Sequence, residues 1–85
     1  MSAEILIIDD NPDIRNIIRD LISEYGYKTR VAANYNQALK EIDKKLPDVA
    51  IIDVKLDKGD NDGIELLSHI KKKNKDVPVI IISGH

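Results

Sequence analysis

The sequence predicts an α/β protein, a doubly wound parallel sheet with helices on both faces. Three short runs are apolar at every position, which is typical of strands that are buried on both faces. Amphipathic stretches with helical spacing lie between them, and the links are short. We expect the strand order 2-1-3-4, the flavodoxin-like order, in one domain over residues 1–85. The apolar runs cover residues 5–8, 49–52 and 79–82.

The first helix is predicted from Asp13 to about Tyr25. Ile and Leu recur there at i, i+3, i+4 and i+7, the spacing of one helix face. Asn11 and Pro12 are an opening signal, and Gly26 follows as a stop signal.

A weaker strand and a second helix come next. Residues 27–32 alternate in polarity, which suits a strand at the edge of the sheet. The second helix is predicted from about Tyr35 to Leu46, with Asn34 as its cap and Pro47 as its end.

The third helix is predicted from about Gly63 to Asn74, with Asp62 as its candidate N-cap. The main basic cluster of the chain, Lys71 to Lys73, lies at its end, where the helix dipole favours cations. Because the formal net charge is −2, the sequence lacks the basic balance of a nucleic-acid-binding domain. We therefore expect no nucleic-acid partner.

Composition favours a small cytoplasmic domain with an aliphatic core. Ile, Leu and Val occupy 27 of the 85 positions, too many for a disordered chain. The absence of Cys excludes disulfides, cysteine zinc sites and thiol nucleophiles, and it fits a reducing compartment. The apolar run near the N-terminus is too short for a signal peptide or a membrane span, so we expect no membrane partner.

Carboxylates follow two of the predicted strands. Asp9 and Asp10 come after the first, Asp53 ends the third, and Ser83 follows the fourth. Ligands of doubly wound sheets bind beyond the carboxyl ends of the strands, near the point where the strand order reverses. Three carboxylates at one such edge raise one another's pKa unless a cation lies between them, and hard oxygen ligands suit Mg²⁺. The sequence therefore predicts a magnesium site there.

Asp53 is the candidate nucleophile of this site. A carboxylate can attack phosphorus and form an aspartyl phosphate, and Ser83 could donate a hydrogen bond to a phosphoryl oxygen. A single Asp in such a loop is more often a helix cap, but three at one edge with a serine favour a site. Glycine-rich phosphate loops are absent, and neither His69 nor His85 has a metal-binding partner at a suitable spacing.

Four segments carry a recognisable pattern across the whole chain. Residues 7–12 hold the acidic pair, residues 51–54 the acceptor, residues 62–67 open the third helix, and residues 78–84 contain the last strand. In this order and spacing they resemble the receiver domain of two-component response regulators. The loop before Gly63 is two residues longer than the commonest form. This loop and the ending Ile-Ser-Gly-His resemble the NtrX-type nitrogen-regulatory branch.

The resemblance implies roles for five residues. Asp53 would accept a phosphoryl group from the histidine of a sensor kinase, and Ser83 would be the switch hydroxyl. Asp10 and Asp53 would bind Mg²⁺ directly, Lys55 would add its backbone carbonyl, and Asp9 would act through water. Such a module phosphorylates and dephosphorylates itself at most, and it turns over no other substrate.

Receivers continue with a helix, a fifth strand ending in a Lys, and a last helix, so we expect a receiver truncated after its fourth strand. Its output, expected to be transcriptional, would lie outside this chain. For a chain of only these residues, the apolar run 79–82 predicts a homo-oligomer formed through the fourth strand or the uncovered faces. Two alternatives stay open: a weakly phosphorylated or unphosphorylated receiver that acts as an interaction module, and a small metal-binding enzyme unrelated to signalling.

Overall fold

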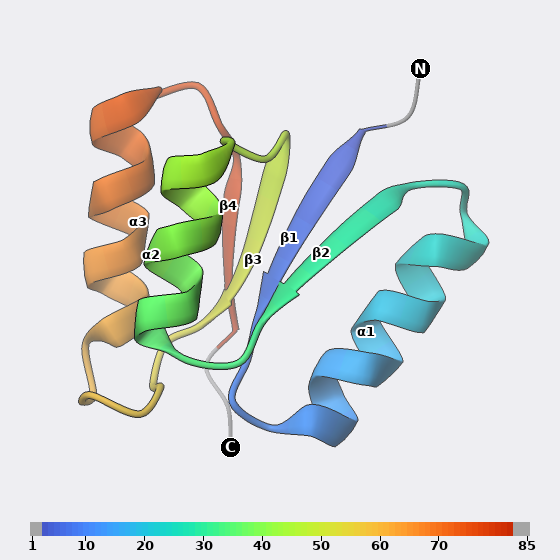
Figure 1. Cartoon of the computed structure of the whole chain (residues 1–85), viewed down its shortest axis with the longest axis horizontal. Coiled ribbons are helices and arrows are strands. Elements are labelled where there is room, and N and C mark those ends of the chain that lie inside the picture. Colours follow the sequence, from blue (N-terminus) through green and yellow to red (C-terminus); the bar gives the residue numbers. More distant parts are fainter. Residues whose placement is uncertain (1–2, 83–85) are drawn as a thin grey trace.

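The computed structural model describes residues 3–82 as a parallel sheet with helices on both faces (Figure 1). The strands are β1 (Glu4–Ile8), β2 (Lys28–Ala32), β3 (Val49–Asp53) and β4 (Val79–Ile82). The helices are α1 (Pro12–Glu24), α2 (Tyr35–Lys44) and α3 (Asp62–Lys73). The strand order is β2-β1-β3-β4, so the predicted fold class, strand order and edge position of β2 are confirmed.

The face of the sheet beneath α2 and α3 holds the main core. Leu6 and Ile8 of β1 alternate onto this face beside their register partners in β3, Ala50 and Ile52. Because parallel strands buried in this way need helices above them, the two neighbouring helices supply the other half of the core. The helix residues that are almost completely buried there are Ala38, Ile42, Leu66 and Ile70.

Among the described residues, α1 is the one helix on the opposite face. Ile5 and Ile7 of β1 alternate onto that face and are buried, whereas Ile80 of β4 is 52% exposed. No residue within α1, which the structure describes throughout, is buried, and Ile17 is 63% exposed. Burial on both faces is therefore confirmed for β1, but it is wrong for β4, because no described helix lies over that strand on the α1 side (Figure 1).

The starts of α1 and α2 agree with the predicted opening signal and cap, and the helix ends differ slightly from the prediction. The side-chain oxygen of Asn11 accepts the first free N–H groups of α1, and that of Asn34 accepts the Gln37 N–H of α2. α2 ends at Lys44, two residues before the predicted end. None of the helices in residues 3–82 has the length and apolar character that crossing a membrane requires.

Candidate metal centre at the carboxyl end of the sheet

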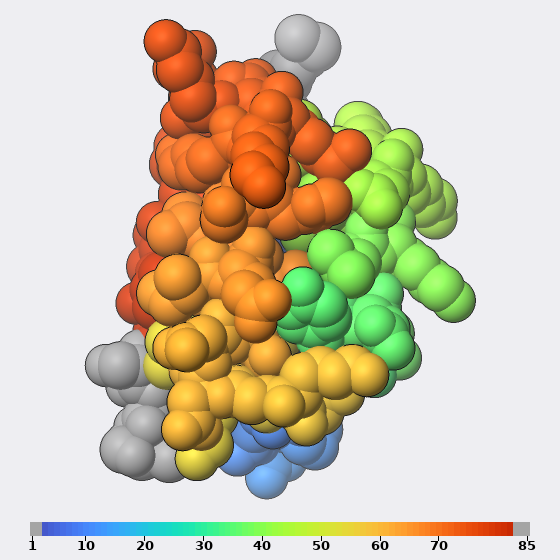
Figure 2. Space-filling model, turned by 90° about the vertical axis from the view of Figure 1, so that its left-hand side faces the viewer, coloured from blue at the N-terminus to red at the C-terminus, as the bar shows by residue number. Residues whose placement is uncertain are grey.

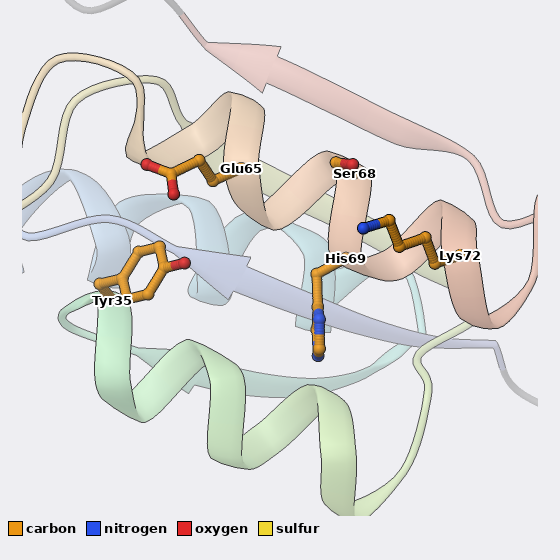
Figure 3. A pocket seen from close by; sticks show the side chains of 5 residues that line it. All are labelled: Tyr35, Glu65, Ser68, His69 and Lys72. Atoms are coloured by element: carbon orange, nitrogen blue, oxygen red, sulfur yellow. The ribbon is translucent and has the colours of Figure 1, made fainter.

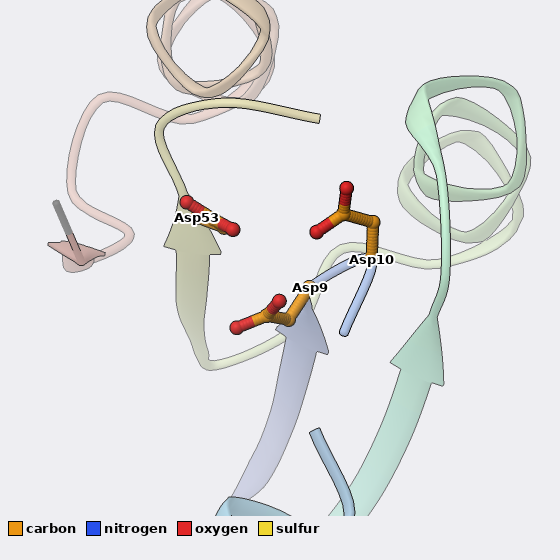
Figure 4. A group of neighbouring side chains, drawn as sticks. All are labelled: Asp9, Asp10 and Asp53. Carbon is orange, nitrogen blue, oxygen red and sulfur yellow. The ribbon is translucent and has the colours of Figure 1, made fainter. Parts of the chain in front are cut away.

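Three carboxylates meet where β1 and β3 end (Figure 4). Ile8 and Ile52 are register partners, so Asp9 and Asp53, which follow them, lie next to each other on the same side of the sheet. Asp10 approaches from the loop after β1. One carboxylate oxygen from each of the three acids lies within 4.8 Å of the others. The fold thus brings together the three acids that the sequence singled out.

The three acids differ in their surroundings. Asp9 and Asp53 are buried, whereas Asp10 is exposed. Burial raises the pKa of Asp9 above its ordinary value, the Asn11 N–H and Arg15 oppose this effect, and the nearby Asp53 carboxylate adds to it. A buried carboxylate beside a second one is stabilised by a cation, and three carboxylate oxygens are the hard ligands that Mg²⁺ takes. The donor set therefore fits a magnesium ion.

Hydrogen bonds hold the loop between β1 and α1. The Asn11 N–H donates to Asp9 Oδ1 at 2.9 Å, and Arg15 Nη1 donates to the Asp9 carbonyl oxygen at 3.0 Å. Arg15 therefore orders the chain beside the acids and places a positive charge near them. Sequence reasoning missed Arg15, although its place in the first turns of a helix that follows an acidic pair was a usable signal.

The loop between β3 and α3 turns over Asp53. Lys55, whose carbonyl the family resemblance implies as a metal ligand, donates its N–H to Asp53 Oδ1 at 3.3 Å. Its ammonium group lies 3.5 Å from Asp60 Oδ1 in the same loop. Leu56, the next residue along the chain, is buried in the core. The backbone of Lys55 therefore lies between the Asp53 carboxylate and the buried Leu56 side chain.

Gly63 brings α3 into direct contact with the end of β3. A Cβ atom at this position would lie 2.6 Å from both the Asp53 carbonyl oxygen and Val54 Cα, closer than such atoms can approach. The Gly63 N–H also donates to the Val54 carbonyl oxygen at 2.9 Å. Glycine is therefore required for α3 to pack this closely against the end of β3.

The prediction that Asp62 is the N-cap of α3 is wrong. Asp62 lies inside the first turn, and Asn61 occupies the cap position without a side-chain capping bond. The buried Asp62 carboxylate instead accepts the N–H groups of Lys58 and Gly59 at 2.8 and 3.0 Å. The side chain turns back to the loop because two loop N–H groups there need an acceptor.

Ser83, the predicted hydroxyl of the site, and His85 lie outside the described residues. His69 Nε2 donates a hydrogen bond to Asp43 Oδ1 at 2.9 Å, and Lys73 Nζ lies 3.2 Å from the same oxygen. These contacts join α2 to α3 and lower the pKa of Asp43, the His69 hydrogen bond having the larger effect. His69 therefore has a structural partner away from the three acids.

A polar hollow of about 270 Å³ lies between α2 and α3 (Figures 2 and 3). The three carboxylates do not line it. Small-molecule sites are mostly apolar with a few polar groups, whereas this hollow is mainly polar and open to solvent. The chemistry of the chain is therefore better sought at the acids. The hollow is lined by Tyr35, Glu65, Ser68, His69 and Lys72.

Known proteins match the chain over its whole length. Residues 5–85 match the family model described as the response regulator receiver domain. The chain is 40% identical over 85 residues to the nitrogen assimilation regulatory protein NtrX of Azorhizobium caulinodans. It is 36% identical over 85 residues to sporulation initiation phosphotransferase F of Bacillus subtilis, and it covers 67% of that protein.

A solved structure matches both the fold and the sequence. The crystal structure of the receiver domain of NtrX from Brucella abortus superposes with a TM-score of 0.84 at 38% identity. The match covers 95% of this chain and 68% of that one. Against the Azorhizobium relative, this chain spans 19% of the length, about a fifth.

Proposed function

The chain belongs to the receiver domains of two-component response regulators, and from this premise we propose that Asp53 accepts a phosphoryl group from the histidine of a sensor kinase. The observation that carries the proposal is the approach of three carboxylates within 4.8 Å around the end of β3. In the transfer, an Asp53 carboxylate oxygen forms a bond to phosphorus as the bond between phosphorus and the histidine nitrogen breaks. The imidazole leaves, and Asp53 becomes an aspartyl phosphate.

The residues present suit Mg²⁺ as the cofactor. Asp10 and Asp53 would hold the ion directly, Lys55 would contribute its carbonyl oxygen, and Asp9 would act through a water. Bound there, Mg²⁺ supplies charge neutralisation for the phosphoryl oxygens. Receiver domains as a family bind Mg²⁺ at an acidic pocket, and the cluster of Asp9, Asp10 and Asp53 is compatible with one.

The chain prepares Asp53 for attack through its own hydrogen bonds. The Lys55 N–H binds Asp53 Oδ1, which orients the carboxylate and leaves Oδ2 to act as the nucleophile. Asp9 is held by the Asn11 N–H, so the neighbouring carboxylate has a defined position. Preorganised groups lower the cost of reaching the transition state, because little reorganisation is needed during the reaction. Ser83 is proposed as the switch hydroxyl that would donate to the phosphoryl group.

Incubation with Mg²⁺ and acetyl phosphate, followed by intact-protein mass spectrometry, tests the proposal. The wild type and Asp60→Asn, a control in the neighbouring loop, should each gain one phosphoryl group. Asp53→Asn should gain none. Absence of addition to the folded wild type, or addition that persists in Asp53→Asn, would contradict the proposal. The first result favours the other class of function, an interaction module that acts without phosphorylation.

The sensor kinase is the proposed partner, and the cytoplasm is the proposed site of action. Because the NtrX relative is a regulatory protein, we propose that the receiver controls a transcriptional output domain.

For a chain of only these residues we also propose self-association through β4. Within residues 3–82, β4 pairs with one strand, and its Ile80 is more than half exposed. Light scattering at micromolar concentration should show a dimer or larger species, and a monodisperse monomer would contradict this.

A further inference from the structure

The loop between β3 and α3, which follows Asp53, is hydrogen-bonded to the start of α2. Asp57, four residues after Asp53, accepts the Tyr35 backbone N–H on Oδ1 at 2.9 Å. Tyr35 is the first residue of α2, so its N–H has no partner within the helix, and the helix dipole favours a carboxylate there. Figure 2 shows the yellow and amber loop lying against the green start of α2.

Other contacts hold the loop on both sides of the hydrogen bond between Asp57 and Tyr35. Leu56 is buried on the side of the acceptor, and beyond Asp57 the N–H groups of Lys58 and Gly59 are held by Asp62. Asp57 lies between these two anchors, and its side chain hydrogen-bonds the first residue of α2. Asp60, by contrast, is exposed, and its carboxylate lies 3.5 Å from the ammonium group of Lys55, which is also exposed. The loop thus contains Asp57, whose carboxylate contacts the distant backbone of Tyr35, and Asp60, whose carboxylate contacts a side chain of the same loop.

We propose that Asp57 is a positioning residue of the phosphoryl-acceptor site. By tying the loop to α2, it holds the backbone of Lys55 beside the three carboxylates, so that the Lys55 carbonyl is in place for Mg²⁺. The inference rests on the proposed function, because the Lys55 carbonyl matters only if the acids bind the ion. Asp57 acts through the backbone and does not itself contact the acids.

Mg²⁺ affinity measured by isothermal titration calorimetry on the whole chain tests this role. Asp57→Ala should weaken Mg²⁺ binding at least about tenfold, the lower end of the usual loss when a group that orients a metal ligand is removed. Asp57→Asn keeps an oxygen that accepts the Tyr35 N–H, so it should retain most of the affinity. Asp60→Ala, in the same loop, should bind Mg²⁺ as the wild type does.

A second pair of variants removes the same hydrogen bond from its other side. Proline is tolerated at the first position of a helix, and Asn34 before it already has the extended backbone that proline requires. Tyr35→Pro therefore deletes the N–H, whereas Tyr35→Ala deletes the side chain and keeps the N–H. Tyr35→Pro should weaken Mg²⁺ binding as Asp57→Ala does, and Tyr35→Ala should not.

The outcomes separate the inference from the function on which it rests. If the folded wild type binds no Mg²⁺, the proposed function and this inference both fail. If the wild type binds Mg²⁺ and Asp57→Ala matches Asp60→Ala, the inference alone fails. A merely structural role would lower the melting temperature of Asp57→Ala and leave the Mg²⁺ affinity of its folded form unchanged, and that result also overturns the inference.

Discussion

On one face of the sheet, α2 and α3 pack Ile42, Leu66 and Ile70 onto β1 and β3, and each of these residues is at most 1% exposed. On the other face, α1 leaves Ile17 and Ile80 more than half exposed. Both faces are rich in Ile, so the difference comes from how many helices cover each face. The covered face holds most of the buried core, and the α1 face presents exposed apolar side chains.

The candidate metal centre is built from both faces of the sheet. From the α2 and α3 side, Gly63 contacts the backbone of Asp53, and Asp57 ties the loop to α2. From the α1 side, Arg15 binds the Asp9 carbonyl. Changes to the covered face should therefore disturb both stability and the site, whereas changes to the outer surface of α1 should disturb neither much.

Leu66→Ala should give the largest effect. Leu66 of α3 is completely buried against the sheet. Its truncation therefore leaves a cavity and should lower the free energy of unfolding by about 2–5 kcal/mol. Urea denaturation followed by circular dichroism measures the change. A loss below about 1 kcal/mol would show that the core beneath α3 can close the cavity, which would weaken the contrast between the faces.

Gly63→Ala should come next. The added Cβ would collide with the backbone of Asp53 and Val54, and relieving such overpacking costs about 1–3 kcal/mol. Gly59→Ala is the matched control, since no atom lies within 4 Å of its Cβ position. The first variant should also accept phosphate from acetyl phosphate more slowly, because α3 is pushed away from the acceptor strand. Equal stability of the two variants would contradict the close contact.

Asp9→Asn should have a smaller effect on stability and the opposite sign. Burial raises the pKa of Asp9 in the folded state above its unfolded value, so the folded state holds this proton more tightly. Stability is therefore lost as the pH rises through that pKa, and removing the charge should stabilise the protein at neutral pH without Mg²⁺. Thermal melts from pH 4 to pH 8 should show a weaker pH dependence in the variant. A neutral-pH stability below that of the wild type would count against this account.

Ile17→Ser should give the smallest effect. The side chain is 63% exposed on α1, and surface substitutions of this kind change stability by about 0.5 kcal/mol or less. Urea denaturation should place the variant close to the wild type. A loss comparable with that of Leu66→Ala would mean that the α1 face is covered in solution, for example by a second copy of the chain.

The sequence by itself determined the order of the elements and the place of the acids. Apolar runs and helical spacing are local patterns, and alternating strands and helices with short links permit few sheet orders. The carboxyl ends of neighbouring parallel strands lie at one edge, so Asp9, Asp10 and Asp53 had to approach one another. The opening signal at Asn11 and the cap at Asn34 were equally local and were predicted correctly.

Only the tertiary structure decided the hydrogen-bond partners of Asp57 and Asp62 and the exposure of Ile80. Asp57 meets an N–H that lies 22 residues away, and Asp62 turns from its expected cap to the preceding loop. Ile80 lies between apolar residues in the sequence, as the buried Leu6 and Ile7 of β1 do. Its exposure depends on which helices lie over it. These outcomes depend on contacts between distant segments. A local pattern specifies which side chains can be buried or hydrogen-bonded, but the partner is supplied by the fold.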